Sequence, residues 1–179
     1  MTQLTRDAVK RIEALPGVTA AVLTCSLPLE PSFGLPFIIE GRALTTSEDH
    51  GGASWRYSSP RFFEVFKIPL VRGRFFTDRN NGAAPGVVLI NESMAKQFWP
   101  KQNPVEQRLT IGKHVGPEFD EPPREIIGVV ADVRDGGLNN EPGAIMYIPA
   151  AQVRVGVMRS ITASSRSRGL CARKSSRFR

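Results

Sequence analysis

The sequence predicts a mixed α+β protein followed by a disordered basic tail. Residues 59–71 carry aromatic residues at helical spacing and then a short apolar run, which predicts a helix followed by a strand. Residues 87–99 show the reverse order, an apolar β-branched run and then a helical pattern. At residue 154 the composition changes abruptly to arginine and serine, which is typical of disorder. The 179 residues suffice for one ordinary domain or two small subdomains.

The first expected element is an amphipathic surface helix over residues 5–14. Its apolar residues follow helical spacing, at Leu4, Ala8, Ile12 and Leu15. Residues 18–24 and 37–40 are apolar and β-branched, so each predicts a strand. The stretch between them, residues 28–36, holds three prolines and predicts a loop.

Residues 54–57 alternate well enough for a strand that enters the next helix. Ser59 is expected to cap this helix, because a serine oxygen can accept from the free amides of the first turn. Phe62 and Phe66 then lie four apart on one helix face. Residues 68–71 follow as a short buried strand. This order predicts a βαβ unit with a right-handed crossover between two paired parallel strands.

The second half repeats the pattern of short elements. Residues 87–90 predict a strand buried on both faces, and Asn91 can cap the helix that follows. Residues 107–111, 126–133 and 144–148 predict three further strands, of which the middle one is the strongest.

The formal charge of +7 is unevenly distributed. Residues 154–179 hold eight Lys or Arg and no acid, so residues 1–153 carry 16 basic against 17 acidic side chains. The body of the protein is therefore nearly neutral. Only the tail could bind a polyanion, and that affinity would be weak, salt-sensitive and independent of base sequence.

Two pairs of side chains could serve in catalysis. His50 and Ser54 could act as base and nucleophile, but no G-x-S-x-G elbow surrounds the serine. Asp132 and Asp135 flank Arg134 and could be paired carboxylates, although charged residues before two glycines are more typical of a solvated turn. We expect no catalytic, cofactor-binding or metal-binding residue.

Metal and nucleotide sites are not indicated either. His50 beside Asp49 and His114 near Glu118 have no second His or Cys at ligand spacing, and no phosphate-binding glycine loop is present. A disulfide between the two cysteines is possible by count. We instead expect Cys25 to be a small buried residue, with Cys171 incidental.

The aromatic residues at helical spacing or beside apolar strands are expected to pack in the core. Phe75 and Phe76 are the exception, because Arg72, Arg74 and Arg79 surround them. If this pair is exposed, it would form a contact patch for a partner protein.

Three phrases carry a family resemblance: SSPRFFEVFKIPLVRGRFFTDRN, PGVVLINESMAKQFWP and REIIGVVADVRD. They closely resemble the MacB-like periplasmic core domain of ABC-transporter permeases, of the FtsX/MacB type, over roughly residues 8–153. The resemblance implies a non-catalytic extracytoplasmic domain that couples transporter motion to a substrate or partner protein outside the membrane. It implies membrane permease helices, a separate ATPase subunit and an extracytoplasmic partner protein as partners, with no specific nucleic acid and no cofactor.

The same resemblance implies how the chain is divided. Residues 1–83 would form the first porter-like half, with its βαβ unit, and residues 84–143 an inserted mixed α/β subdomain. Residues 144–153 would re-enter the porter-like subdomain as a strand. Residues 154–179 would be the disordered basic tail, where a frame shift near codon 154 would explain why the family pattern stops and the domain is incomplete.

The expected location at the periplasmic face of the cell membrane rests on the resemblance alone. The longest apolar candidate, residues 17–29, is too short to cross a bilayer, and the charged start of the chain does not read as a secretory signal. Two alternatives stay open. One is a cytosolic domain whose basic tail binds nucleic acid, and the other is a small hydrolase that uses His50 and Ser54 or the two aspartates.

Overall fold

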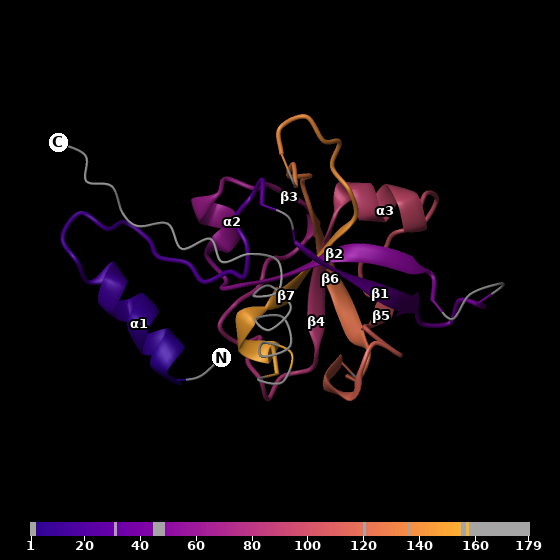
Figure 1. Ribbon diagram of the computed structural model, residues 1–179, viewed down its shortest axis with the longest axis horizontal. Helices are drawn as coiled ribbons and strands as arrows, with labels where there is room; N and C mark the ends of the chain where they lie inside the picture. Colours follow the sequence, from indigo (N-terminus) through magenta and orange to yellow (C-terminus); the bar gives the residue numbers. More distant parts are fainter. Residues whose placement is uncertain are drawn as a thin grey trace.

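The computed structural model describes residues 3–30, 32–44, 49–119, 121–135, 137–154 and 157. The described part is a mixed α/β structure, as expected, and its strands form one large sheet (Figure 1). In chain order its elements are α1 (Gln3–Glu13), β1 (Phe33–Ile39), β2 (Gly51–Ser58), α2 (Phe62–Val65), β3 (Leu70–Gly73), β4 (Val87–Asn91), α3 (Glu92–Phe98), β5 (Arg108–Ile111), η1 (Pro117–Phe119), β6 (Arg124–Val130), β7 (Ile145–Pro149) and η2 (Ala150–Gln152).

The strands form one sheet in the order β3-β6-β4-β7-β2-β1-β5, and β5 also pairs with β6. Six strands therefore close into a ring, and β3 lies outside it. The edge of β6 that faces away from β4 pairs with two strands. Glu125, near the start of β6, pairs with β5, and Gly128, further along, pairs with Gly73 of β3. Strands β2 and β7 are parallel, as are β4 and β6.

The expected pairing between residues 54–57 and 68–71 is wrong. In the sheet, β7, β4 and β6 lie between β2 and β3, and β2 pairs with β7 instead. The reason lies in the segment between them. Phe62, Phe63 and Ile68 pack on the outer face of β4, β6 and β7, so the chain crosses under three strands before β3 begins.

The core has two layers, one inside the ring and one outside. Each of the six ring strands contributes apolar side chains to the inner cluster, and α3 adds Met94. Strand β4 shows the division most clearly, because Val88 and Ile90 face inward while Val87 and Leu89 face α2. The prediction of a strand buried on both faces is confirmed.

Local signals gave mixed results at the helix starts. Asn91 caps α3 as predicted, since its Oδ1 accepts from the amide of Met94. Ser59 does not cap α2, whose first flanking residue is Arg61 without a side-chain cap. The Ser59 hydroxyl oxygen accepts from the amide of Leu23 instead, and so ties the preceding segment to the end of β2.

The region before β2 also differs from expectation. Residues 18–24 form no strand, and only Thr24 makes an isolated bridge to Ser58. Strand β1 begins at Phe33, within the predicted proline loop. Pro36 is tolerated there because the ladder with β5 begins only at Phe37, so no ladder bond needs its missing amide.

Helix α1 confirms the predicted N-terminal helix and stands apart from the sheet (Figure 1). Glu13 connects it to the body: its carboxylate accepts from Arg61 at 3.0 Å and from the amide of Ala21 at 3.3 Å. Ile12 and Leu15 are about half exposed.

No helix in the described ranges is long and apolar enough to cross a membrane. Apart from Arg154 and Val157, the predicted tail lies outside the described residues, and Val157 packs in the inner cluster. The proposed division at residues 83, 143 and 153 stays a prediction. The strands of these ranges share the one sheet.

Candidate functional site

A charged side chain lies inside the protein on β2. Arg56 is completely buried, and its strand neighbours Trp55 and Tyr57 pack with the inner cluster, so Arg56 points to the opposite face. Its Nε donates to Ser26 Oγ at 2.9 Å, and its Nη2 lies 2.5 Å from Asp135 Oδ1. The same Nη2 donates to the carbonyl of Leu27 at 3.3 Å.

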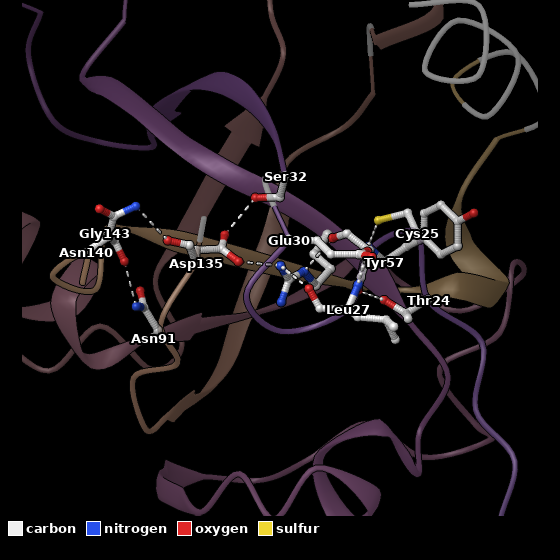
Figure 2. A network of polar contacts seen from close by, with 12 residues as sticks. Thr24, Cys25, Leu27, Glu30, Ser32, Tyr57, Asn91, Asp135, Asn140 and Gly143 are labelled. Carbon is white, nitrogen blue, oxygen red and sulfur yellow. Dashed lines mark hydrogen bonds and ion pairs between the residues drawn. The ribbon is translucent and has the colours of Figure 1, made fainter. Parts of the chain in front are cut away.

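Asp135 joins a second chain segment to this arginine. Its other carboxylate oxygen accepts from the Ser32 hydroxyl at 2.9 Å, and these two residues face each other in Figure 2. We call Ser26, Ser32, Arg56 and Asp135 the Arg56 cluster. It joins residues 24–30, Ser32 and the Asp135 end of the connection between β6 and β7 to β2.

The energetics of the cluster favour a structural clamp. A buried guanidinium is costly unless a carboxylate and further acceptors satisfy it, and removing one partner of such a pair costs about 3–5 kcal/mol. The Asp135 side chain is 13% exposed, so this pair is largely shielded from water. The clamp therefore fixes the β6–β7 connection far more firmly than a surface ion pair would.

Tyr147 lies opposite Arg56 on the neighbouring strand β7 and is fully buried. Burial raises the pKa of the Tyr147 hydroxyl, an effect that Arg56 opposes and Asp135 reinforces. Within the described part of the chain, the Tyr147 hydroxyl, Ser58 Oγ and Arg56 Nη1 are buried without a hydrogen-bond partner. Tyr147 is thus a neutral neighbour of the clamp.

Asp132 belongs to a different arrangement at the start of α3. Its carboxylate accepts from Asn91 Nδ2 at 2.6 Å and from both the amide and the hydroxyl of Ser93 at 2.8 Å. Asn91 Oδ1 also accepts from the amide of Ile145 at 2.9 Å. Asp132 and Asn91 therefore lock α3 to the ends of β6 and β7. The expectation of a solvated turn is wrong, since both aspartates are partly buried and engaged.

His50 and Ser54 do not form a base and nucleophile pair. His50 Nδ1 accepts from the amide of Ile39 at 3.0 Å, so the lone pair of this nitrogen is already used. His50 Nε2 is buried without a hydrogen-bond partner among the described residues, so no hydrogen bond joins it to the Ser54 hydroxyl. In the described ranges, no three His, Cys, Asp or Glu residues gather as metal ligands.

The condition set for Phe75 and Phe76 is not met, and the expectation for Cys25 is wrong. Phe76 is buried, and Phe75 stacks on Phe63 with ring centroids 5.2 Å apart, so this pair forms no exposed aromatic patch. Cys25 is exposed rather than buried, and its sulfur accepts from the amide of Tyr57 (Figure 2).

Little in the local sequence predicts the Arg56 cluster. One signal was an arginine between Trp55 and Tyr57 in a strand, because side chains alternate and the arginine must face away from both rings. That opposite face is usually exposed, and nothing local shows that residues 24–32 and Asp135 cover it.

The segments that the Arg56 cluster joins bear three exposed leucines. We call them the leucine tip, and they are Leu27, Leu29 and Leu138. Leu29 has a φ of 73°, which is uncommon for a bulky residue, and its amide donates to the carbonyl of Arg134 at 3.1 Å. The Arg134 side chain in turn donates to the carbonyl of Leu138. The two segments that bear the leucines are therefore bound to each other.

Several solved structures share this fold, and two of them are transporter domains from bacteria. One is the periplasmic region of MacB from Actinobacillus actinomycetemcomitans, with a TM-score of 0.54 and 19% identity over 88% of this chain and 58% of that one. The other is the extracellular domain of the ABC-type transporter YknZ from Gram-positive bacteria, with a TM-score of 0.53 and 17% identity over 88% and 65%. The chain thus spans less than two thirds of either structure.

The fold is therefore that of extracytoplasmic transporter domains. The family model of the MacB-like periplasmic core domain matches residues 1–170, and the chain belongs to this family. No curated protein matches the chain. The family match extends beyond residue 153, where the sequence alone suggested that the resemblance ends, so the match itself does not place a break at residue 154.

Proposed function

We propose that the chain is a non-catalytic, extracytoplasmic core domain of an ABC-transporter permease. In this role it would couple the motion of membrane helices, driven by a separate ATPase, to a substrate or partner protein outside the membrane. The observation that carries the proposal is the family match over residues 1–170, and the similar fold of the two transporter domains supports it.

The Arg56 cluster supports the coupling part of this proposal. A domain that transmits motion needs a contact surface that moves with its scaffold rather than independently of it. The leucine tip has this property, because Arg56 of β2 binds the Asp135 carboxylate and the Leu27 carbonyl, and the Leu29 amide joins the two segments to each other. Exposed apolar side chains on a fixed scaffold are typical of protein contact sites.

The location can be tested by cysteine labelling in the source organism. A variant with Cys25→Ser, Cys171→Ser and Leu138→Cys carries one thiol at a position that is 65% exposed. A maleimide that does not cross the inner membrane should label this thiol in intact cells. Labelling only after lysis would overturn the proposal and favour a cytosolic domain.

The coupling role needs a second measurement. Deleting the gene defines a phenotype, and Leu138→Asp should reproduce most of it while leaving the unfolding transition unchanged. Val115→Asp is the matched control, because Val115 is also exposed but lies in the turn after β5. Equal phenotypes for the two variants would contradict a specific role for the leucine tip.

A further inference from the structure

A pocket lies between α1 and the body of the protein and is separate from the Arg56 cluster. Its volume is about 440 Å³, which falls within the range of pockets that hold small organic molecules. Helix α1 forms one wall, and Ala21 with residues 59–61, 77–78, 80–81 and 149–151 forms the others. The helix stands beside the sheet in Figure 1, and Glu13 and Arg61 connect it to the body.

Two charges of opposite sign line this pocket on different walls. Lys10 comes from α1 and Asp78 from the turn after β3, and both side chains are exposed. Neither makes an ion pair with any residue that the structure describes. Arg61 and Glu13 also line the pocket, but they pair with each other at 3.0 Å. The charges left for a ligand are therefore one ammonium group and one carboxylate.

A buried amide adds a hydrogen-bond donor. Asn80 lines the pocket and is only 8% exposed. Its Oδ1 accepts from the amide of Thr77 at 3.0 Å and from Arg74 at 3.4 Å. Because a backbone amide can only donate, these contacts fix which end of the side chain is the oxygen. Asn80 Nδ2 has no acceptor among the described residues and is free to donate to a carbonyl or carboxylate of a ligand.

The rest of the lining is largely apolar. Its apolar residues come from four separate segments, and they are Val9, Ala21, Pro60, Pro149, Ala150 and Ala151. An apolar ligand body can pack against them while its polar ends reach the charged residues.

We propose that this pocket binds a small zwitterion with an apolar body, the chemistry that an unblocked apolar dipeptide presents. Lys10 binds the carboxylate, Asp78 binds the ammonium group, and Asn80 donates to a carbonyl oxygen between them. This goes beyond the proposed function, because binding requires neither membrane helices nor an ATPase. A failed binding experiment would leave the location of the domain untouched.

The test is a titration of the full chain with three probes, in which isothermal titration calorimetry and backbone amide NMR measure binding. The probes are leucyl-leucine, its C-terminal amide and its N-acetyl form. The unblocked dipeptide should bind more tightly than either blocked form, by about tenfold for each lost charge. Amide signals of residues 77–81 and of α1 should shift during the titration.

Two variants separate the charges. Lys10→Gln should weaken the binding of leucyl-leucine about tenfold. It should leave the affinity for the amidated probe unchanged, since that probe has no carboxylate for Lys10 to bind. Asp78→Asn should weaken the binding of the unblocked and amidated probes. It should leave the affinity for the acetylated probe unchanged, since that probe has no ammonium group for Asp78 to bind. Lys101→Gln is the control, because Lys101 is exposed and lies outside the pocket.

Three outcomes would overturn the proposal. The first is that no probe binds at millimolar concentration, and the second is that all three bind equally. The third is that Lys10→Gln and Lys101→Gln weaken the unblocked probe to the same extent, which would indicate a general charge effect.

Discussion

Among the described residues, two arginines are buried, and they hold different kinds of structure together. Arg56 is fully buried, and the Arg124 side chain is 7% exposed. Each has a carboxylate at 2.5 Å, Asp135 for the first and Glu121 for the second. Glu121 lies only three residues before Arg124, whereas Asp135 lies 79 residues after Arg56. One pair closes a local loop, and the other joins distant parts of the chain.

The two arginines also differ in how much they depend on their carboxylate. Arg124 donates to Gln152 Oε1 at 2.9 Å and contacts the carbonyls of Gln152 and Val87, so it links β6 to β4 and η2. Arg56 keeps one buried nitrogen, Nη1, without a partner in the described structure. We infer that Arg56 is the more costly of the two to leave without its negative charge.

Asp135→Asn should therefore have the largest effect on stability. The change leaves a fully buried guanidinium without an anion, and we expect the free energy of unfolding to fall by about 3–5 kcal/mol. Urea denaturation followed by tryptophan fluorescence measures this loss, since Trp55 and Trp99 are buried in the core.

A double variant shows whether the loss comes from the uncompensated charge. Arg56→Met together with Asp135→Asn removes both ionic partners, so it should recover a large part of the stability that Asp135→Asn loses. If Asp135→Asn alone lowers the free energy of unfolding by less than about 1 kcal/mol, the pair behaves like a surface ion pair. The interpretation of the Arg56 cluster as a structural clamp would then be wrong.

Glu121→Gln should have a smaller effect at the other arginine. Arg124 retains its neutral acceptors and some contact with water, so we expect a loss of about 1–2 kcal/mol in the same denaturation experiment. Glu125→Gln is the control, because Glu125 is exposed on the same strand and forms no ion pair with a described residue. If Glu121→Gln costs as much as Asp135→Asn, the distinction between the two arginines fails.

This contrast also marks what the sequence could predict. The unit of β4 and α3 followed from local signals, because a doubly buried strand and the Asn91 cap depend on residues within a few positions. The pairing of β2 with β7 joins residues about 90 positions apart, and no local pattern specifies it. The predicted pairing of β2 and β3 was wrong for the same reason.

The candidate site followed the same division. Asp132 and Asp135 were found as neighbouring carboxylates, but their partners were not, because Asn91 and Arg56 approach them only when the sheet is complete. A pattern of charges before a glycine turn has the same appearance whether the turn is solvated or covered. Only the packing of residues 24–30 and of Ser32 against Arg56 and Asp135 distinguishes the two cases.

Tyr147→Phe should have the smallest effect at neutral pH and a clear effect at high pH. The Tyr147 hydroxyl has no partner in the described structure, so its removal should change the free energy of unfolding by less than about 1 kcal/mol. Burial raises the pKa of this group, whereas the unfolded chain ionises near its ordinary value of about 10. Below that pH both states are protonated and the group adds no pH dependence.

Above that pH the unfolded state loses its proton first, so stability falls as the pH rises, by up to about 1.4 kcal/mol per pH unit from this residue. Tyr147→Phe should remove that part of the slope in denaturation curves measured between about pH 9 and 11.5. Tyr57→Phe is the control, because Tyr57 is half-buried and is the other tyrosine of the chain. Burial raises its pKa too, so this variant should also flatten the curve, but less. Equal slopes for Tyr147→Phe and the unmodified chain would show that Tyr147 ionises as readily in the folded protein as in the unfolded one, and that water reaches the side of the clamp.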